Sequence, residues 1–132
     1  MTTELFWLTL IVLNTGLFWV PYILDRIRVV GLMAALTMPK PEPGVQSPWA
    51  DRAMKAHANA VENLAIFAPA VLTAHVLNIH TPVTRAAAIA YFIGRTMHFI
   101  GYTNAIPFLR PAGFGIGCLA QMAMLLSILG WI

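Results

Sequence analysis

Two rows of polar side chains could carry chemistry in this otherwise apolar chain. The members of each row are three or four residues apart, and this spacing places them on one face of a helix. The rows are Arg52, Lys55, Asn59 and Glu62, and then Arg95, His98 and Tyr102. Each charged group inside bilayer hydrocarbon costs about 2.5–3.5 kcal/mol on insertion scales. We therefore expect these side chains to face one another, water or a ligand.

Two interpretations of the rows are open. Glu62 is the only acid deep in the apolar part of the chain, so its expected partner is Arg95 or Lys55. One interpretation is a polar clamp between two helices that fixes their register. The other is a hydrophilic pocket, open to the cytoplasmic side and lined by both signs of charge, which would suit a zwitterionic ligand. Spacing alone does not decide between them.

Arg110 could form an anion site of its own. If Pro111 takes the first position of the last helix, Arg110 is the N-cap residue. Its guanidinium charge then coincides with the positive end of the helix. Such a site favours the thiolate of a bound thiol, which is the nucleophilic form. The alternative is an interfacial arginine that extends its charge into water.

The composition is that of an integral membrane protein. Of 132 residues, 59% are hydrophobic and 10% are charged, whereas soluble domains carry about 25% charged residues. Three stretches have no Asp, Glu, Lys or Arg: residues 5–24, 63–84 and 111–132. A fourth, residues 86–108, contains only Arg95 and His98 as basic groups. Each approaches the ~20 residues that a membrane-crossing helix needs, so we expect four spans.

The four spans predict an all-α membrane protein, a single four-helix bundle over residues 1–132. Residues 37–48 are a proline-rich linker, and Ser47-Pro48 and Thr81-Pro82 are helix-start signals. Basic residues gather at one side of the membrane, where Arg26, Arg28, Lys40, Arg52, Lys55 and Arg110 lie, and only Arg85 flanks the other. The positive-inside tendency then predicts a multi-pass membrane protein with both termini outside the cytoplasm.

This charge pattern, at the ends of the spans, does not indicate nucleic-acid binding. The sequence has no zinc motif, Ser–His–Asp arrangement or phosphate-binding loop, so no metal ligand is assigned. A bundle of four such helices has little interior in which to enclose both polar rows. Either the bundle encloses them tightly or several subunits do so together, and the second is favoured because a single bundle would leave one flank of each row facing lipid. We therefore expect several subunits to enclose them together.

Two segments resemble the MAPEG superfamily, which includes microsomal glutathione transferases, leukotriene-C synthase and microsomal prostaglandin E synthase. They are DRAMKAHANAVENLAIF, residues 51–67, and GRTMHFIGYTNAIPFLRPAGF, residues 94–114. The length, the four spans and the order of the motifs extend the resemblance over essentially the whole chain.

The resemblance implies a homotrimer with glutathione as co-substrate, bound between neighbouring subunits near the cytosolic side. Asn59 and Glu62 would hold the glutathione backbone, with Glu62 taking the amine, and Arg110 would stabilise the thiolate. The remaining binding residues that it implies are Arg26 from the first helix and Arg95, His98 and Tyr102 from the third.

The chain departs from the family pattern at two positions. Ala58 stands where eicosanoid-type members commonly have an arginine that grips a glutathione carboxylate, and Phe114 stands where a tyrosine is expected. The resemblance predicts a bacterial-type glutathione transferase or peroxidase whose apolar electrophile or lipid hydroperoxide arrives from the bilayer. The alternative is a non-catalytic lipid-binding or accessory membrane subunit that retains the scaffold.

Overall fold

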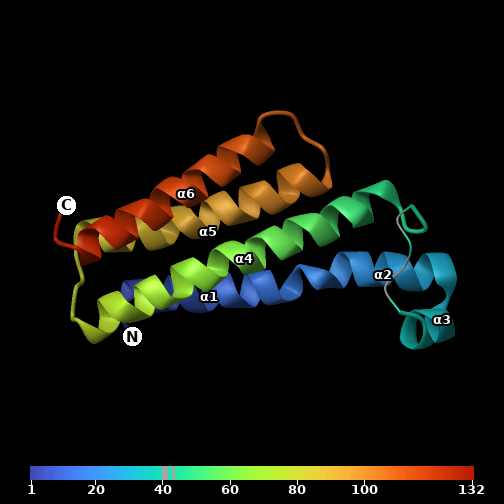
Figure 1. Ribbon diagram of the computed structural model, residues 1–132, viewed down its shortest axis with the longest axis horizontal. Coiled ribbons are helices and arrows are strands. Elements are labelled where there is room, and N and C mark those ends of the chain that lie inside the picture. The colour runs from blue at the N-terminus through green and yellow to red at the C-terminus, as the bar shows by residue number, and fades with distance from the viewer. Residues whose placement is uncertain (40–41, 43) are drawn as a thin grey trace.

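The computed structural model describes residues 1–39, 42 and 44–132, and all regular structure in this part of the chain is helical. The helices are α1 (Thr3–Leu17), α2 (Trp19–Val30), α3 (Leu32–Thr37), α4 (Pro48–Val76), α5 (Pro82–Thr103) and α6 (Leu109–Ile128). The long helices lie side by side in an elongated bundle, with α1 and α2 in line as its first column (Figure 1). Both termini lie at the same end of this bundle.

The first column is interrupted at Phe18, where the sequence predicts an unbroken span over residues 5–24. Phe18 N–H donates to the carbonyl of Thr15 over 3.2 Å, a tighter turn than in an α-helix. Pro21 has no N–H, so the Leu17 carbonyl loses its usual partner four residues later. Taken together, residues Thr3–Val30 are still long and apolar enough to cross a membrane.

The linker prediction for residues 37–48 is confirmed at the described residues between Met38 and Ser47, whereas Thr37 is the last residue of α3. Residues 38, 39, 42 and 44–47 lie outside helices, whereas Lys40, Pro41 and Pro43 lie outside the described residues. The sequence did not predict α3, which follows α2 directly after Gly31. Gly31 has a φ of +86°, a conformation that glycine adopts without steric cost, and it redirects the chain between the two helices.

The uncharged stretch 63–84 is divided between two helices, as the Thr81-Pro82 start signal predicts. α4 ends at Val76 and α5 begins at Pro82, capped by a reciprocal pair of hydrogen bonds between Thr81 and Thr84. Residues 63–76 at about 1.5 Å each cover only about 21 Å of the ~30 Å hydrocarbon layer. A span that ends at Val76 therefore includes Asn59 and Glu62, which places the first polar row within the membrane or at its border.

By length and apolar composition alone, two helices in the described part of the chain qualify as membrane spans, Thr3–Val30 and Leu109–Ile128. The other two long helices, α4 and α5, carry the polar rows. Their polar and charged side chains lower the hydropathy of these two helices.

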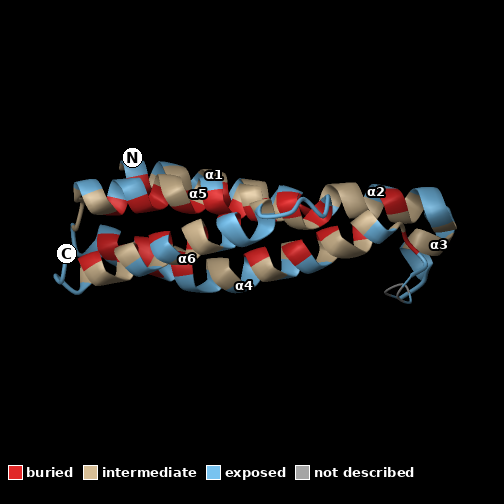
Figure 2. Cartoon of the chain, turned by 90° about the horizontal axis from the view of Figure 1, so that it is seen from above, coloured by how far each residue is buried: buried red, intermediate tan, exposed pale blue. Residues whose placement is uncertain are grey.

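The core lies along the centre of the bundle, where buried residues form a stripe on α1, α4, α5 and α6 (Figure 2). Phe67 of α4 and Tyr91 of α5 stack with ring centroids 3.7 Å apart. α5 and α6 approach most closely at glycines: a Cβ on Gly94 would lie 2.7 Å from the backbone nitrogen of Gly117. Small residues allow this backbone contact, and it fixes α6 against the polar face of α5.

Candidate functional site

Residues from both polar rows line one cavity of about 500 Å³. It is formed by three helices, and its lining is Lys55 and Asn59 of α4, His98 and Tyr102 of α5, and Arg110, Pro111 and Phe114 of α6. Its lining includes Arg110 and Pro111 in the first turn of α6. The α5–α6 connection before this turn lies away from the two termini (Figure 1). We call it the Arg110 cavity. Its size is within the range of small-molecule sites.

Arg95 joins the two rows behind this cavity. Its Nη2 donates to Oδ1 of Asn59 over 2.6 Å, and the residue is only 4% exposed. Its Nε and Nη1 atoms are buried without a hydrogen-bond partner in the described part of the chain. This pair is therefore a polar clamp between the two rows, and Asn59 of the pair also lines the Arg110 cavity.

Glu62 has no ion pair among the described residues, and the expected partnership with Arg95 or Lys55 is not formed. Arg95 runs inward over Gly117, where a Cβ would lie 3.0 Å from the Cδ of the arginine. Glu62 instead lies on the exposed flank of α4. The carboxylate is therefore available to a ligand or to another subunit.

His98 of α5 contacts the first turn of α6. Its Nδ1 donates to the carbonyl oxygen of Arg110 over 3.1 Å, which assigns the proton to this nitrogen because a carbonyl only accepts. Its ring lies 5.7 Å from the Tyr102 ring and 5.8 Å from the Phe114 ring. The buried Nε2 has no partner in the described residues, so it remains free to accept a hydrogen bond.

Arg110 is not the N-cap residue, contrary to the sequence prediction. The N-cap is Phe108, which adopts a left-handed conformation with φ +64°, and α6 begins at Leu109. Pro111 is then the third helical residue, which is tolerated because the first four N–H groups of a helix have no intrahelical partner. Arg110 still lies in the first turn, so its charge coincides with the positive helix end. Its guanidinium lies 5.2 Å from the centroid of the Tyr102 ring.

Within one chain, Arg26 does not line the Arg110 cavity. Its Nη2 donates to the carbonyls of Met38 and Pro39 at 2.9 and 2.7 Å. It lines a second cavity of about 490 Å³, which a different face of α4 forms with α2. We call it the Arg26 cavity; Ala58 lines it, as does His57, which shares a 2.7 Å hydrogen bond with Tyr22.

The structure thus unites Asn59, His98, Tyr102 and Arg110, with Arg95 behind them, and leaves Glu62 at the margin and Arg26 apart. Lys55 belongs to the cavity although the resemblance gave it no role. The sequence could have indicated this role, because Lys55 lies four residues before Asn59 on the same face of the helix. Pro111 and Phe114 complete the wall. The resemblance had already indicated the position of Phe114, four residues after Arg110.

The charge of the Arg110 cavity determines which ligands it favours. Lys55 and Arg110 contribute two cations, and no acidic residue of the described chain is among its lining. An anionic group is therefore favoured inside, while the nearby Glu62 carboxylate favours a cationic group at the margin.

The MAPEG family model matches residues 5–130 of this chain. No curated protein matches the sequence at a significant level.

Proposed function

Because the chain belongs to the MAPEG family, whose members are four-helix membrane bundles, we propose that it is a membrane glutathione transferase or peroxidase. In this proposal it works as a homotrimer in a bacterial inner membrane, with both termini outside the cytoplasm. The observation that carries the proposal is the Arg110 cavity, in which Lys55, Asn59, His98, Tyr102 and Arg110 converge from three helices.

Glutathione fits the chemistry of this cavity. It carries two carboxylates, one amine and a thiol. The two cations, Lys55 and Arg110, match its anionic groups, the Asn59 amide can bond a peptide group, and the exposed Glu62 carboxylate can take the amine. Tyr102 and His98 add hydrogen-bonding groups on the α5 wall, and Arg95 holds Asn59 in place.

The proposed reaction begins when the glutathione thiol releases its proton to water. The Arg110 guanidinium and the positive end of α6 stabilise the thiolate. The sulfur attacks an electrophilic carbon of an apolar substrate from the bilayer, a C–S bond forms, and the leaving group departs with the electron pair. With a lipid hydroperoxide, the thiolate sulfur attacks the terminal oxygen, an S–O bond forms and the O–O bond breaks. This gives glutathione sulfenic acid and an alkoxide, which takes a proton from water to become the alcohol. A second glutathione then forms the disulfide and releases water.

The proposal of a trimer is supported by the exposure of Glu62. A charge on the outer flank of a membrane helix costs about 2.5–3.5 kcal/mol when it faces lipid. A neighbouring subunit that covers this flank removes this cost and encloses the ligand. The Arg26 cavity, on a different face of α4, would then contribute Arg26 to the site of an adjacent subunit.

Calorimetric titration of the purified protein with glutathione tests the proposal. We expect binding heat and a higher melting temperature at millimolar glutathione. Arg85→Ala is the matched control, because Arg85 is an exposed arginine at the other end of α5 and should leave binding unchanged. Neither heat nor thermal stabilisation with the unmodified protein would remove the proposal.

The second candidate function is that of a non-catalytic lipid-binding or accessory subunit. Phe114 favours it, because it lines the Arg110 cavity without the hydroxyl that a thiolate could use. Arg110→Ala separates the two candidates. An enzyme should lose turnover while it remains a folded trimer, whereas an accessory subunit has no turnover to lose.

A further inference from the structure

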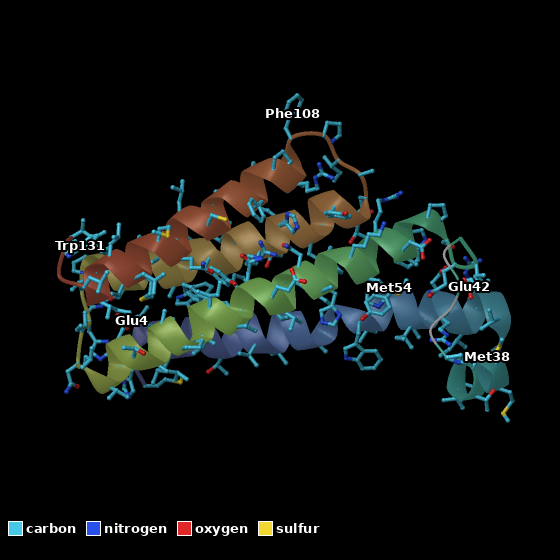
Figure 3. All side chains as sticks on the ribbon, viewed as in Figure 1. Glu4, Met38, Glu42, Met54, Phe108 and Trp131 are labelled. Atoms are coloured by element: carbon cyan, nitrogen blue, oxygen red, sulfur yellow. The ribbon has the colours of Figure 1, made fainter. Side chains whose placement is uncertain are left out.

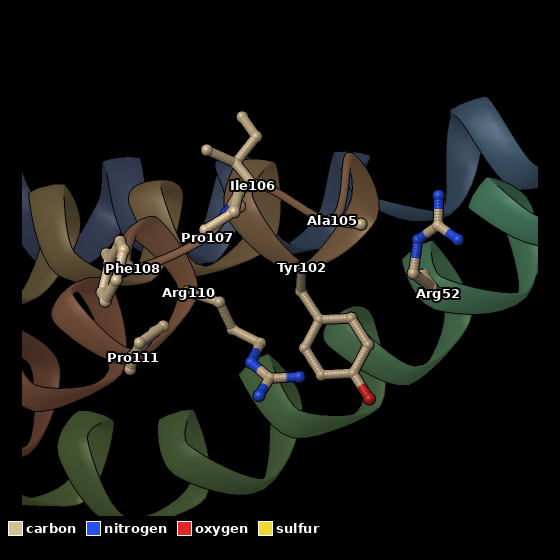
Figure 4. A pocket seen from close by; sticks show the side chains of 9 residues that line it. Arg52, Tyr102, Ala105, Ile106, Pro107, Phe108, Arg110 and Pro111 are labelled. Atoms are coloured by element: carbon tan, nitrogen blue, oxygen red, sulfur yellow. The ribbon is translucent and has the colours of Figure 1, made fainter.

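We propose that a separate cavity beside the Arg110 cavity binds the anionic headgroup of a single-chain amphiphile through Arg52, and that this amphiphile is the second substrate. The cavity has a volume of about 390 Å³ and is lined by Arg52, Tyr102, Ile106, Pro107, Phe108 and Arg110, among others (Figure 4). We call it the Arg52 cavity. The role of this amphiphile as a substrate rests on the proposed function, whereas the binding of its headgroup to Arg52 does not.

Arg52 is held in place by one of its three guanidinium nitrogens. Its Nε donates over 2.9 Å to the carbonyl of Thr103, the last residue of α5. The two Nη atoms have no hydrogen-bond partner in the described residues, and the side chain is half-buried. A guanidinium fixed in this way presents two parallel N–H donors, which match the two oxygens of a carboxylate or phosphate.

The charge in the Arg52 cavity is not balanced within the described chain. Arg52 and Arg110 are both among its lining residues, and no acidic side chain is. The Tyr102 ring lies between the two arginines, with the Arg110 guanidinium over it (Figure 4). Two cations around one partly enclosed space repel each other, and an anion bound there removes this repulsion.

The other wall of the cavity is apolar and belongs to the α5–α6 connection. Ile106, Pro107 and Phe108 form it, and Phe108 is 85% exposed and points away from the bundle (Figure 3). This connection joins two helices at the end of their spans, the level at which membrane-interface side chains lie. A ligand that fits both walls has a charged head at Arg52 and a hydrocarbon chain that leaves over the connection.

The two cavities share Tyr102, Arg110 and Pro111. A headgroup bound at Arg52 is therefore next to the space that we assign to glutathione. This proximity is the reason to identify the amphiphile with the second substrate. It predicts that the protein favours acidic amphiphiles over neutral ones of the same chain length.

Direct binding tests the headgroup site without any need for glutathione. The probes are dodecanoate, dodecyl phosphate and dodecanol, titrated into the full-length protein in a neutral detergent. Both anions should raise the melting temperature and dodecanol should not; the tighter anion shows whether a fatty acid or a phospholipid-type headgroup is the better match. Arg52→Gln should weaken anion binding by about tenfold or more, because the hydrogen bonds between the guanidinium and the anionic headgroup are lost.

Two variants control for effects of Arg52→Gln other than the loss of the contact with the headgroup. Arg52→Lys keeps the charge and should retain part of the affinity, and Arg85→Gln should change nothing. If Arg52→Gln does not fold, added salt should weaken the binding of dodecanoate to the unmodified protein but not that of dodecanol. Equal binding of dodecanol and dodecanoate, or unchanged affinity in Arg52→Gln, overturns the proposal.

Turnover tests the link to the reaction. With an acidic electrophile and its methyl ester as substrates, Arg52→Gln should raise the KM of the acid about tenfold and leave the KM of the ester and of glutathione unchanged. A higher KM for glutathione would instead assign Arg52 to glutathione and overturn the proposal. If glutathione does not bind at all, the proposed function fails, but the dodecanoate titration still decides the headgroup site.

Discussion

At the scale of single residues, the hydrogen bond between Arg95 and Asn59 does most to determine the site. The sequence predicted that the two polar rows would meet, and they do. It predicted the wrong pair, because the spacing of Asn59 and Glu62 places both on one face of the helix without showing which of them reaches Arg95. Gly117 decides this, since it leaves room for the arginine to run inward and bond the amide.

Asn59→Ala should destabilise the protein by about 1.5–3 kcal/mol, because it removes the only hydrogen-bond acceptor that Arg95 has in the described residues. Asn59→Asp is the control, since it supplies a carboxylate acceptor and should recover most of the loss. Thermal unfolding in detergent measures both. If Asn59→Ala unfolds at the same temperature as the unmodified protein, the bond does not stabilise the bundle.

Arg110→Ala should move the pH dependence of turnover upward. An ordinary thiol has a pKa of about 8.5, and a nearby cation lowers the pKa by favouring the thiolate. Without the guanidinium the pKa of bound glutathione rises, so the limb of the rate profile that reports thiolate formation shifts to higher pH. Arg110→Lys keeps the charge and should shift it less. An unshifted profile in Arg110→Ala would show that this residue does not act on the thiol.

At the scale of helices, the sequence predicted the starts of those helices whose first residue is a proline. Thr81-Pro82 predicted the start of α5, and Ser47-Pro48 that of α4. The start of α6 was placed two residues late, because the turn before it depends on a left-handed Phe108, a conformation that a bulky residue rarely adopts. The short helix α3 was missed for a related reason, since Gly31 permits a change of direction that no residue pattern specifies.

A pair of glycines on α6 tests how closely α5 and α6 must pack. In Gly113→Ala the added Cβ would collide with the backbone nitrogen of His98, whereas the same change at Gly115 meets nothing within 4 Å. We expect Gly113→Ala to destabilise by about 1–3 kcal/mol and Gly115→Ala to be neutral or stabilising, because alanine favours helix. Melting temperatures measure both. Equal effects would mean that the contact between α5 and α6 can relax.

At the scale of the whole molecule, the separation of Arg26 from Arg110 argues for a site that two subunits share. Within one chain the two arginines line cavities on different faces of α4. If glutathione contacts both, they must come from different subunits. The sequence could not show this, because the positions of Arg26 and Arg110 along the chain say nothing about which subunit contributes each.

Subunit mixing tests this arrangement. Homotrimers of Arg26→Ala and of Arg110→Ala should each lose most turnover. When the two variants are co-expressed in equal amounts, random assembly places an intact Arg110 next to an intact Arg26 of the neighbour at about a quarter of the sites. Turnover should therefore return to about a quarter of the unmodified level, whereas mixing the two purified homotrimers without exchange should restore none. If both arginines acted within one subunit, no mixed trimer would contain an intact site, and co-expression would restore nothing.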